Sequence, residues 1–209
     1  MKLVTLLSSG IDSPVATYLL SKKTTDIIFL HADIRPFTGR KEKEIFLKIA
    51  KKLKDIITPN IKIYIISHGE NLDEYIKKCD KKYTCIFCKR MMLRYAEKIA
   101  EKENASAIIM GDSLGQVASQ TLDNLNVIDK SINFPVLRPL IGFDKQDIID
   151  ISKRISLYDL SILPSEGCMA VPNKPSTSAK IEKIIQQEKK LDIKKLVEKT
   201  VKDSKIVKI

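Results

Sequence analysis

The sequence predicts an α/β domain with a doubly wound parallel sheet and helices on both faces. Three observations favour this class: short apolar runs recur along the chain, amphipathic stretches separate them, and no internal repeat interrupts the alternation. Parallel strands buried on both faces are continuously apolar, and their crossover helices cover the sheet. The 209 residues suffice for one domain, and 44% hydrophobic with 30% charged residues excludes a disordered chain.

The elements follow in order along the chain. Apolar runs that predict strands occupy residues 2–7, 26–31, 61–67, 105–111 and 134–140. Helical periodicity between them predicts helices over 14–22, 40–57, 72–79 and 89–103. In the last of these, Met92, Tyr95, Ala96 and Ile99 fall on one helical face. Pro135 and Pro139 cut the fifth strand short.

The predicted domain extends over residues 1–178, and residues 179–209 are expected to form a charged helical extension of it. Residues 161–178 contain Pro164, Pro172 and Pro175 with little periodicity, which predicts an extended loop. From Ala179 onward, the pattern KIEKIIQQEKKLDIKKLVEKTVKD predicts one or two helices. No low-complexity linker indicates a second independent domain.

The net charge of +11 leaves the partner open, since 31 of the 37 basic residues are lysine. Phosphate contacts give affinity for nucleic acid, and residues 40–54 and 189–208 are the candidate surfaces. A plain solvated face is favoured for each, and 6% aromatic residues without tryptophan argue against base stacking. No apolar run approaches the roughly 20 residues of a membrane span, so no membrane association is expected. The first apolar run ends at Ser8, too early for a secretory signal, and a cytoplasmic location is expected.

A turn of small residues, Ser8-Ser9-Gly10-Ile11-Asp12-Ser13, directly follows the first predicted strand. Ligands of α/β sheets bind at the carboxyl ends of strands, where a helix N-terminus presents unpaired N–H groups to an anion. We expect Ser13 to cap the next helix and Pro14 to occupy its first turn. The turn lacks the Walker and dinucleotide fingerprints, and from these residues alone an ordinary strand-to-helix turn stays open.

The turn resembles the S-G-G-x-D-S pyrophosphate loop of N-type ATP pyrophosphatases, with Ser9 in place of the usual first glycine. Residues 111–122 (GDSLGQVASQTL) resemble a signature of the tRNA 4-thiouridine synthetases (ThiI). Segments 90–92 (RMM), 138–145 (RPLIGFDK) and 161–164 (SILP) are similar to that family too. The resemblance covers almost the whole chain. It implies ATP-dependent tRNA thiolation, in which the uridine at position 8 of tRNA is adenylated and its O4 is replaced by sulfur.

The resemblance also implies the site residues. The ATP contacts fall on Leu6, Leu7, Ser8, Ser9, Gly10, Asp12, Ser13, His31, Ala32, Lys89, Gly111 and Gln120. The catalytic residues are Asp12, near Mg²⁺ and the phosphates, Lys145, which stabilises charge during adenylation, and Cys168. Without the resemblance, His31 would be an ordinary strand-terminus histidine and Lys89 one solvated lysine among many.

The four cysteines are too few for a disulfide scaffold, and Cys85-x-x-Cys88 indicates metal or redox chemistry. Cys168 aligns with the essential cysteine of the family, which carries a persulfide in bacterial members. Three interpretations stay open: ordinary cysteines, a zinc site completed by Cys79 or a histidine, and an iron–sulfur cluster. A 4Fe-4S cluster held by Cys85, Cys88 and Cys168 is favoured, because the pattern resembles the cluster-dependent tRNA thiolases. Cys79 is expected to be structural.

Sulfur would then come from sulfide or a persulfide carrier, and AMP and pyrophosphate would be released. Full-length members of the family have an RNA-capture domain ahead of the ATP loop, so a separate RNA-capture protein or a dimer mate is expected to present the tRNA. Two other functions stay open. One is sulfur transfer or desulfuration on a small molecule, such as a thiamine precursor or thionucleobase. The other is a non-catalytic iron–sulfur or nucleotide-binding regulator, which the presence of Asp12, Lys145 and Cys168 argues against.

Overall fold

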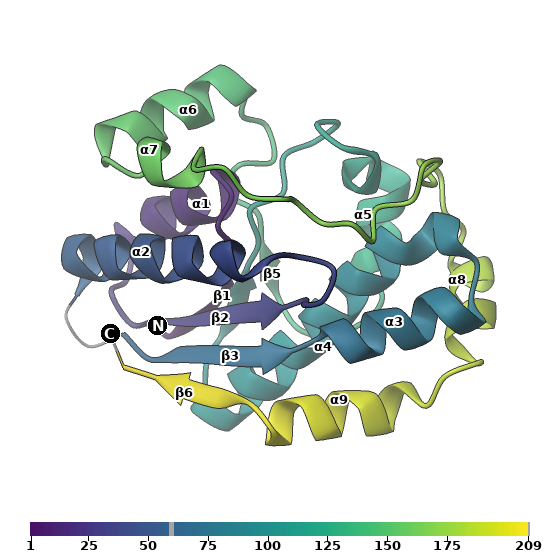
Figure 1. Cartoon of the computed structure of the whole chain (residues 1–209). Coiled ribbons are helices and arrows are strands. Elements are labelled where there is room, and N and C mark those ends of the chain that lie inside the picture. The colour runs from purple at the N-terminus through teal and green to yellow at the C-terminus, as the bar shows by residue number, and fades with distance from the viewer. Residues whose placement is uncertain (59–60, 209) are drawn as a thin grey trace.

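The computed structural model describes residues 1–58 and 61–208, and within them one sheet of six strands runs through the molecule in the order β5-β4-β1-β2-β3-β6 (Figure 1). The strands are β1 Leu3–Leu6, β2 Ile27–Asp33, β3 Ile63–Ser67, β4 Ala107–Ile109, β5 Val136–Leu137 and β6 Lys205–Val207. Neighbours from β5 to β3 are parallel, which confirms the predicted α/β class. The edge strand β6 is antiparallel to β3 and was not predicted.

The helices confirm the predicted alternation and add to it. They are α1 Asp12–Ser21, α2 Arg40–Ile57, α3 Gly69–Lys78, α4 Thr84–Glu103, α5 Leu122–Asp129, α6 Lys145–Arg154, α7 Tyr158–Ser161, α8 Ile181–Glu188 and α9 Ile193–Lys202. The predicted helix over 40–57 has the observed bounds of α2, whereas α4 begins five residues before the predicted start. The helices α5, α6 and α7 were not predicted; α5 and α7 are short, whereas α6 has the same length as α1. None of the helices in the described ranges has the length and apolar content that a membrane crossing requires.

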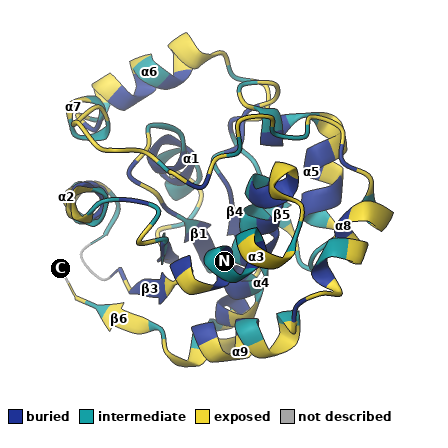
Figure 2. Ribbon diagram, turned by 45° about the vertical axis from the view of Figure 1, so that its right-hand side comes forward, coloured by how far each residue is buried: buried dark blue, intermediate teal, exposed yellow. Residues whose placement is uncertain are grey.

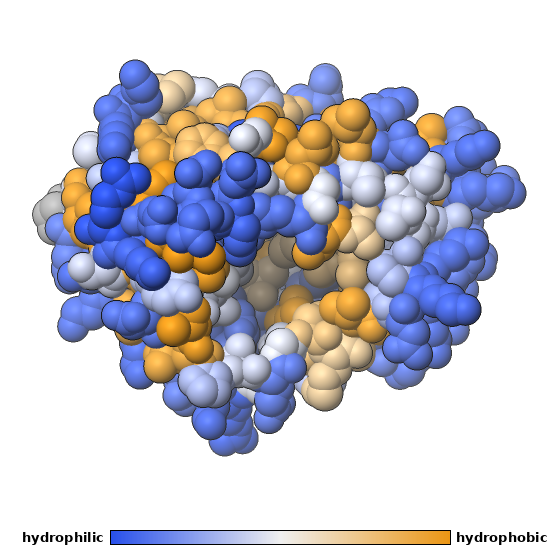
Figure 3. Space-filling view, turned by 90° about the horizontal axis from the view of Figure 1, so that it is seen from above, coloured by the Kyte–Doolittle hydropathy of each residue, from blue (hydrophilic) through white to orange (hydrophobic). Residues whose placement is uncertain are grey.

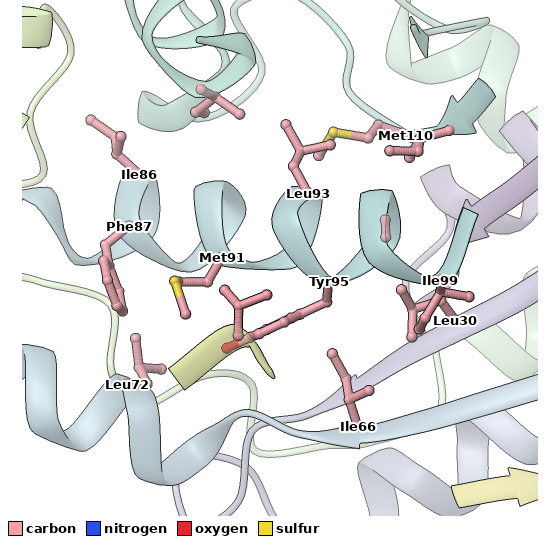
Figure 4. Packing of buried hydrophobic residues seen from close by; sticks show 14 of the residues in the cluster. Leu30, Ile66, Leu72, Ile86, Phe87, Met91, Leu93, Tyr95, Ile99 and Met110 are labelled. Carbon is pink, nitrogen blue, oxygen red and sulfur yellow. The ribbon is translucent and has the colours of Figure 1, made fainter. Parts of the chain in front are cut away.

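Alternate residues of the central strands face two separate cores. Val4 and Leu30 pack with α3, α4, α5 and α9, whereas Leu3 and Phe29 pack with α1, α2 and α6. The helix α4 supplies much of the first core, in which Phe87, Met91, Tyr95 and Ile99 point from it toward neighbouring elements (Figure 4). Exposed residues gather on the outer faces of the helices, and the strands between them are buried (Figure 2).

The strand order reverses between β1 and β4, and this position determines where a ligand can bind. The chain proceeds from β1 to β2 and β3 on one side, then crosses back to β4 on the other. At such a reversal the loops after the two central strands diverge and leave a crevice at their carboxyl ends. Near Gly111, which follows β4, the two loops nevertheless approach each other closely. A Cβ added to Gly111 would lie 2.6 Å from the backbone nitrogen of Ser13. Glycine at this position allows the two backbones to approach.

The C-terminal segment packs against the sheet domain through a buried ion pair and through β6. Glu188 of α8 accepts hydrogen bonds from Arg90 and Arg94 of α4, each at 2.8 Å from Oε1. Burial opposes ionisation of Glu188, but the two arginines outweigh it and lower its pKa to about 2. The helices α8 and α9 match the helical tail that the sequence predicts, and β6 follows them at the edge of the sheet.

Candidate functional site

A cavity of about 330 Å³ opens at the carboxyl ends of β1, β2 and β4, at the reversal of strand order. Its wall contains every residue predicted to contact ATP except Ser9. The wall also contains residues that sequence analysis missed, including Asp33, Thr38, Glu42, Lys43 and Asp112. Seen from the side on which α6 and α7 lie, the surface is hollowed near its centre, and hydrophobic residues border the hollow (Figure 3).

The loop after β1 is held by its own serines. The Ser8 N–H group donates to Ser13 Oγ at 2.8 Å, and the two hydroxyls lie 2.9 Å apart. The prediction that Ser13 caps α1 is therefore wrong: Ile11 precedes the helix without a side-chain cap, and the Ser13 hydroxyl binds the loop instead. Pro14 does occupy the first turn, as predicted.

Ser9 fits where the related loop has glycine. The non-glycine residues with positive φ in the described ranges are Asn104 and Ser156, so Ser9 needs no left-handed backbone. Its hydroxyl donates to a carboxylate oxygen of Glu42 in α2, which belongs to the cavity wall, whereas Ser9 itself does not line the cavity. A residue with a Cβ can therefore adopt the conformation that the loop has at this position, and the Ser9 hydroxyl links the loop to α2 by a hydrogen bond.

Two predicted catalytic residues, Lys145 and Asp12, pair although they are far apart in the sequence; Asp12 lines the cavity, whereas Lys145 does not belong to its wall. The Nζ atom of Lys145, at the start of α6, lies 2.5 Å from Oδ1 of Asp12, at the start of α1. Both side chains keep part of their surface in solvent, so an incoming ligand can reach them. This pair places a cation and a carboxylate beside the anion-binding end of a helix.

His31 is an uncharged part of the cavity wall. Its Nδ1–H donates to the carbonyl of Leu7 at 3.2 Å, and its ring stacks on Phe46 with 3.9 Å between the centroids. Burial lowers the pKa of His31 to about 4, so the ring is neutral at pH 7. The residue contributes shape and a fixed Nε2 acceptor, and it brings no positive charge to the site.

Asp112 lies at the carboxyl end of β4 and is buried among cations. Lys89 Nζ lies 2.6 Å from its Oδ1, and Arg138 Nε lies 3.0 Å from its Oδ2. Gln120 Nε2 approaches Oδ1 at 3.4 Å. Sequence analysis assigned Lys89 and Gln120 but not Asp112. The signal available was an acidic residue directly after Gly111 in the segment that resembles the family signature.

A second cavity, of about 390 Å³, contains the three cysteines that were predicted to act together. Cys85 and Cys88, one turn apart on α4, line it together with Cys168 from the loop between α7 and α8. This thiol pocket also has an apolar wall formed by Leu72, Val117, Ala170, Val171 and Pro175. It shares Ile34, Cys88, Lys89 and Met92 with the first cavity, so the two spaces adjoin.

The three thiols lie in a setting that favours their neutral forms. Burial and the neighbouring thiols raise the pKa of Cys88 to about 12, and burial raises the pKa of Cys85 and Cys168. In the described part of the chain, no three His, Cys, Asp or Glu side chains already surround a single metal-ion position. Cys85, Cys88 and Cys168 nevertheless line one cavity, and cysteine thiolates are the ligands that hold iron–sulfur clusters.

The structure separates Cys79 and the two histidines from the thiol pocket. Cys79 follows α3, and its thiol donates to the Gln187 carbonyl at 3.4 Å. His68 is buried with Nδ1 3.0 Å from the Tyr95 hydroxyl, and His31 faces the other cavity. None of the three lines the thiol pocket. The fourth protein ligand that a closed zinc site would need is therefore not supplied by these residues.

A mostly parallel sheet, with a serine- and glycine-containing anion loop at its reversal point, defines an α/β domain of the PP-loop ATP pyrophosphatase class. The family model with the description thiamine biosynthesis protein (ThiI) matches residues 1–193. The chain belongs to the ThiI family. These matches confirm the predicted family and the predicted fold.

Curated relatives agree with this placement. The chain is 44% identical over 197 residues to a probable tRNA sulfurtransferase of Methanothermobacter thermautotrophicus, covering 94% of this chain and 51% of that protein. It is 41% identical over 209 residues to a probable tRNA sulfurtransferase of Methanosarcina mazei, covering 100% and 52%. The chain thus spans about half the length of the curated relatives it matches.

Solved structures give the same grouping. A 4-thiouridine synthetase crystallised with RNA and bound ATP superposes with a TM-score of 0.92 at 34% identity, covering 99% of this chain and 54% of that one. The NMN synthetase of Francisella tularensis superposes with a TM-score of 0.61 at 14% identity, covering 94% and 75%. The second match shows a shared fold alone.

Proposed function

We propose that this chain carries the catalytic centre of an ATP-dependent tRNA sulfurtransferase that converts uridine at position 8 of tRNA to 4-thiouridine. The observation that carries the proposal is the shared wall between the ATP-type cavity and the thiol pocket, formed by Ile34, Cys88, Lys89 and Met92. Adenylation of O4 and attack of sulfur on C4 must occur at the same uracil carbonyl group, and adjoining cavities allow both. Supporting it, the relatives bear the name tRNA sulfurtransferase, and the solved neighbour binds ATP and RNA.

In the first step, the uridine O4 attacks the α-phosphorus of ATP and pyrophosphate leaves. The loop from Ser8 to Ser13 and the N-terminus of α1 would hold the departing pyrophosphate through backbone N–H groups. Lys145 would stabilise the negative charge that develops on the transferred phosphate. Asp12, which orients Lys145 in the structure, offers the carboxylate oxygen that Mg²⁺ prefers.

In the second step, sulfur attacks C4 of the adenylated uracil and AMP leaves with the former O4. The apolar wall of the thiol pocket would limit the access of water, which would otherwise hydrolyse the adenylate back to uridine. Cys85, Cys88 and Cys168 would hold a 4Fe-4S cluster there. When bound, the cluster would supply a site for sulfide, which displaces AMP without a change of oxidation state. Sulfur from a persulfide carrier would first need two electrons from a thiol reductant to become sulfide.

The tRNA would reach the two cavities across the loops that surround them. The lysine-rich α2 begins beside the ATP cavity, where Lys43 forms part of the wall. Arg40 and Lys41 line a neighbouring groove with Pro164 and Ser165, next to the loop that carries Cys168. These cations are available to backbone phosphates. A separate RNA-capture protein or a dimer mate would then supply the affinity that orients the acceptor uridine.

The function is tested by anaerobic incubation of the iron-reconstituted chain with ATP, sulfide and unmodified tRNA, followed by digestion to nucleosides. We expect 4-thiouridine that depends on ATP and on Cys168. A matched reaction contains a thiamine precursor or a free thionucleobase in place of tRNA. Turnover of the small molecule without 4-thiouridine formation, when tRNA and a capture protein are supplied, would replace the proposal with small-molecule sulfur transfer.

A further inference from the structure

Asp112 joins the side chains of the ATP cavity into one charged cluster. Its Oδ1 accepts from Lys89 at 2.6 Å and from Gln120 at 3.4 Å, and its Oδ2 accepts from Arg138 at 3.0 Å. Arg138 also donates to both carboxylate oxygens of Asp129 in α5, at 2.9 and 2.5 Å. The order of charges is therefore Lys89, Asp112, Arg138, Asp129, with alternating sign from the cavity wall at Lys89 and Asp112 to the partly exposed Asp129, which lies outside that wall.

The cluster is buried at Asp112 and opens toward the ligand at Lys89. Asp112 is 3% exposed, whereas 17% of the Lys89 side chain remains accessible. Burial opposes ionisation of Asp112, but Lys89 and Arg138 outweigh it and keep the pKa of the carboxyl below its usual range. An ionised carboxylate only accepts hydrogen bonds, so it directs the ammonium of Lys89 and the amide nitrogen of Gln120 toward itself.

The same contacts leave Asp112 little capacity to bind a metal ion. Both of its oxygens already accept charge-assisted hydrogen bonds, from Lys89 and from Arg138, although Asp112 itself borders the cavity. The orientation of the Gln120 amide agrees with this. Its Nε2 faces Asp112, whereas its buried Oε1 has no hydrogen-bond partner among the described residues. A free amide would turn to satisfy both atoms, so the carboxylate determines which way Gln120 points.

We propose that Asp112 is a positioning residue for nucleotide use. It fixes the Lys89 ammonium in the wall shared by the two cavities and the Gln120 amide in the wall of the ATP cavity. The proposal rests on the proposed function, since both partners belong to the predicted ATP contacts. Lys89 lies where the ATP cavity meets the thiol pocket. Holding it there keeps one positive charge at the boundary of the two cavities. A displacement of about 1 Å is enough to lower a rate by roughly 100-fold.

The test compares Asp112→Asn with Asp129→Asn. Both variants remove one carboxylate from the same charge cluster, but Asp129 is not part of the cavity wall, and within the described residues its side chain is paired with Arg138 and not with Lys89. We expect Asp112→Asn to lower kcat/KM for ATP by about 10- to 100-fold with the KM for tRNA unchanged. Asp129→Asn should stay within about 3-fold of the unaltered protein. Equal losses in the two variants would overturn the proposal, because they would indicate a purely structural role.

A double-mutant cycle shows whether Asp112 acts through Lys89. In a Lys89→Met background, Asp112→Asn should reduce kcat/KM for ATP by less than about 3-fold further, because its partner is already absent. Full multiplication of the two losses would contradict the proposal. The double variant removes one charge of each sign and leaves neither Lys89 nor Asp112 without its partner. Its kcat/KM can therefore be compared with that of Lys89→Met even if Asp112→Asn alone lowers Tm.

Direct ATP titration separates this proposal from the proposed function. The Kd for ATP is measured on the iron-reconstituted chain without tRNA. If the protein binds ATP with a Kd that depends on Asp112 but makes no 4-thiouridine, the positioning role of Asp112 stands and the proposed thiolation is rejected. An Asp112→Asn variant with unchanged Kd and unchanged kcat/KM would reject the positioning role while thiolation stands.

Discussion

Replacing Gly111 by alanine tests whether the reversal of strand order creates the nucleotide site. The added Cβ would lie 2.6 Å from the Ser13 nitrogen, 2.7 Å from the Ser13 Cα and 2.9 Å from the Asp12 carbonyl carbon. These neighbours are backbone atoms, so no side-chain rotation relieves the contact. To restore the 3.4 Å of an ordinary contact, the loop after β1 must retreat by about 0.8 Å.

That displacement moves the N-terminus of α1 and the Asp12–Lys145 pair away from the phosphates. We expect Gly111→Ala to lower kcat/KM for ATP by about 100-fold and to cost about 1–3 kcal/mol of stability through overpacking. The assay is pyrophosphate release with tRNA present, together with thermal unfolding. Gly142→Ala is the matched control, because nothing lies within 4 Å of a Cβ at that position. Wild-type kinetics in Gly111→Ala would refute the close approach of the two loops.

Three further predictions address the ion pairs and the thiols. The pKa of Glu188 is lowered to about 2, so at pH values above the usual glutamate pKa its carboxylate should contribute about 3 kcal/mol to the free energy of unfolding. This contribution should be lost as the pH falls from about 4.5 toward 2. Chemical unfolding at pH 7 and pH 3 checks this, and the difference between the two pH values should be smaller in Glu188→Gln. Lys145→Met should slow pyrophosphate release by about 100- to 1,000-fold. The Tm should be nearly unchanged, because the ion pair between Lys145 and Asp12 is partly exposed. A normal rate of pyrophosphate release would exclude a role of Lys145 in adenylation. Cys85→Ser should abolish iron retention after anaerobic reconstitution while Cys79→Ser should not, as measured by iron content; equal iron in both would contradict a cluster at the thiol pocket.

The part of the site that is contiguous in sequence was predictable. The turn from Ser8 to Ser13 directly follows an apolar run and precedes a helix, so its place at a strand end follows from local pattern. Helix α2 was predicted to its ends, because its apolar face repeats over 18 residues and Gly39 precedes it. Local errors arose where two partners compete: Ser13 has a hydroxyl suited to a cap, but the Ser8 amide takes it.

Contacts between distant segments were not predictable from these patterns. Asp112 is paired with residues 23 and 26 positions away, and its contact with Arg138 depends on β4 lying next to β5 in the sheet. The strand β6 has three residues, with Ile206 exposed, and its pairing with β3 is made across most of the chain. A short half-exposed segment after a charged helix has no periodicity strong enough to predict a strand.

The central claim is that uridine is activated by adenylation at O4 and that sulfur then displaces AMP. It is tested most directly by following oxygen-18 placed at O4 of the target uridine in tRNA, with the reconstituted chain, ATP and sulfide. The account predicts one labelled oxygen in AMP for each 4-thiouridine formed, and none in pyrophosphate. Label in inorganic phosphate or water, or 4-thiouridine formed without labelled AMP, would contradict it.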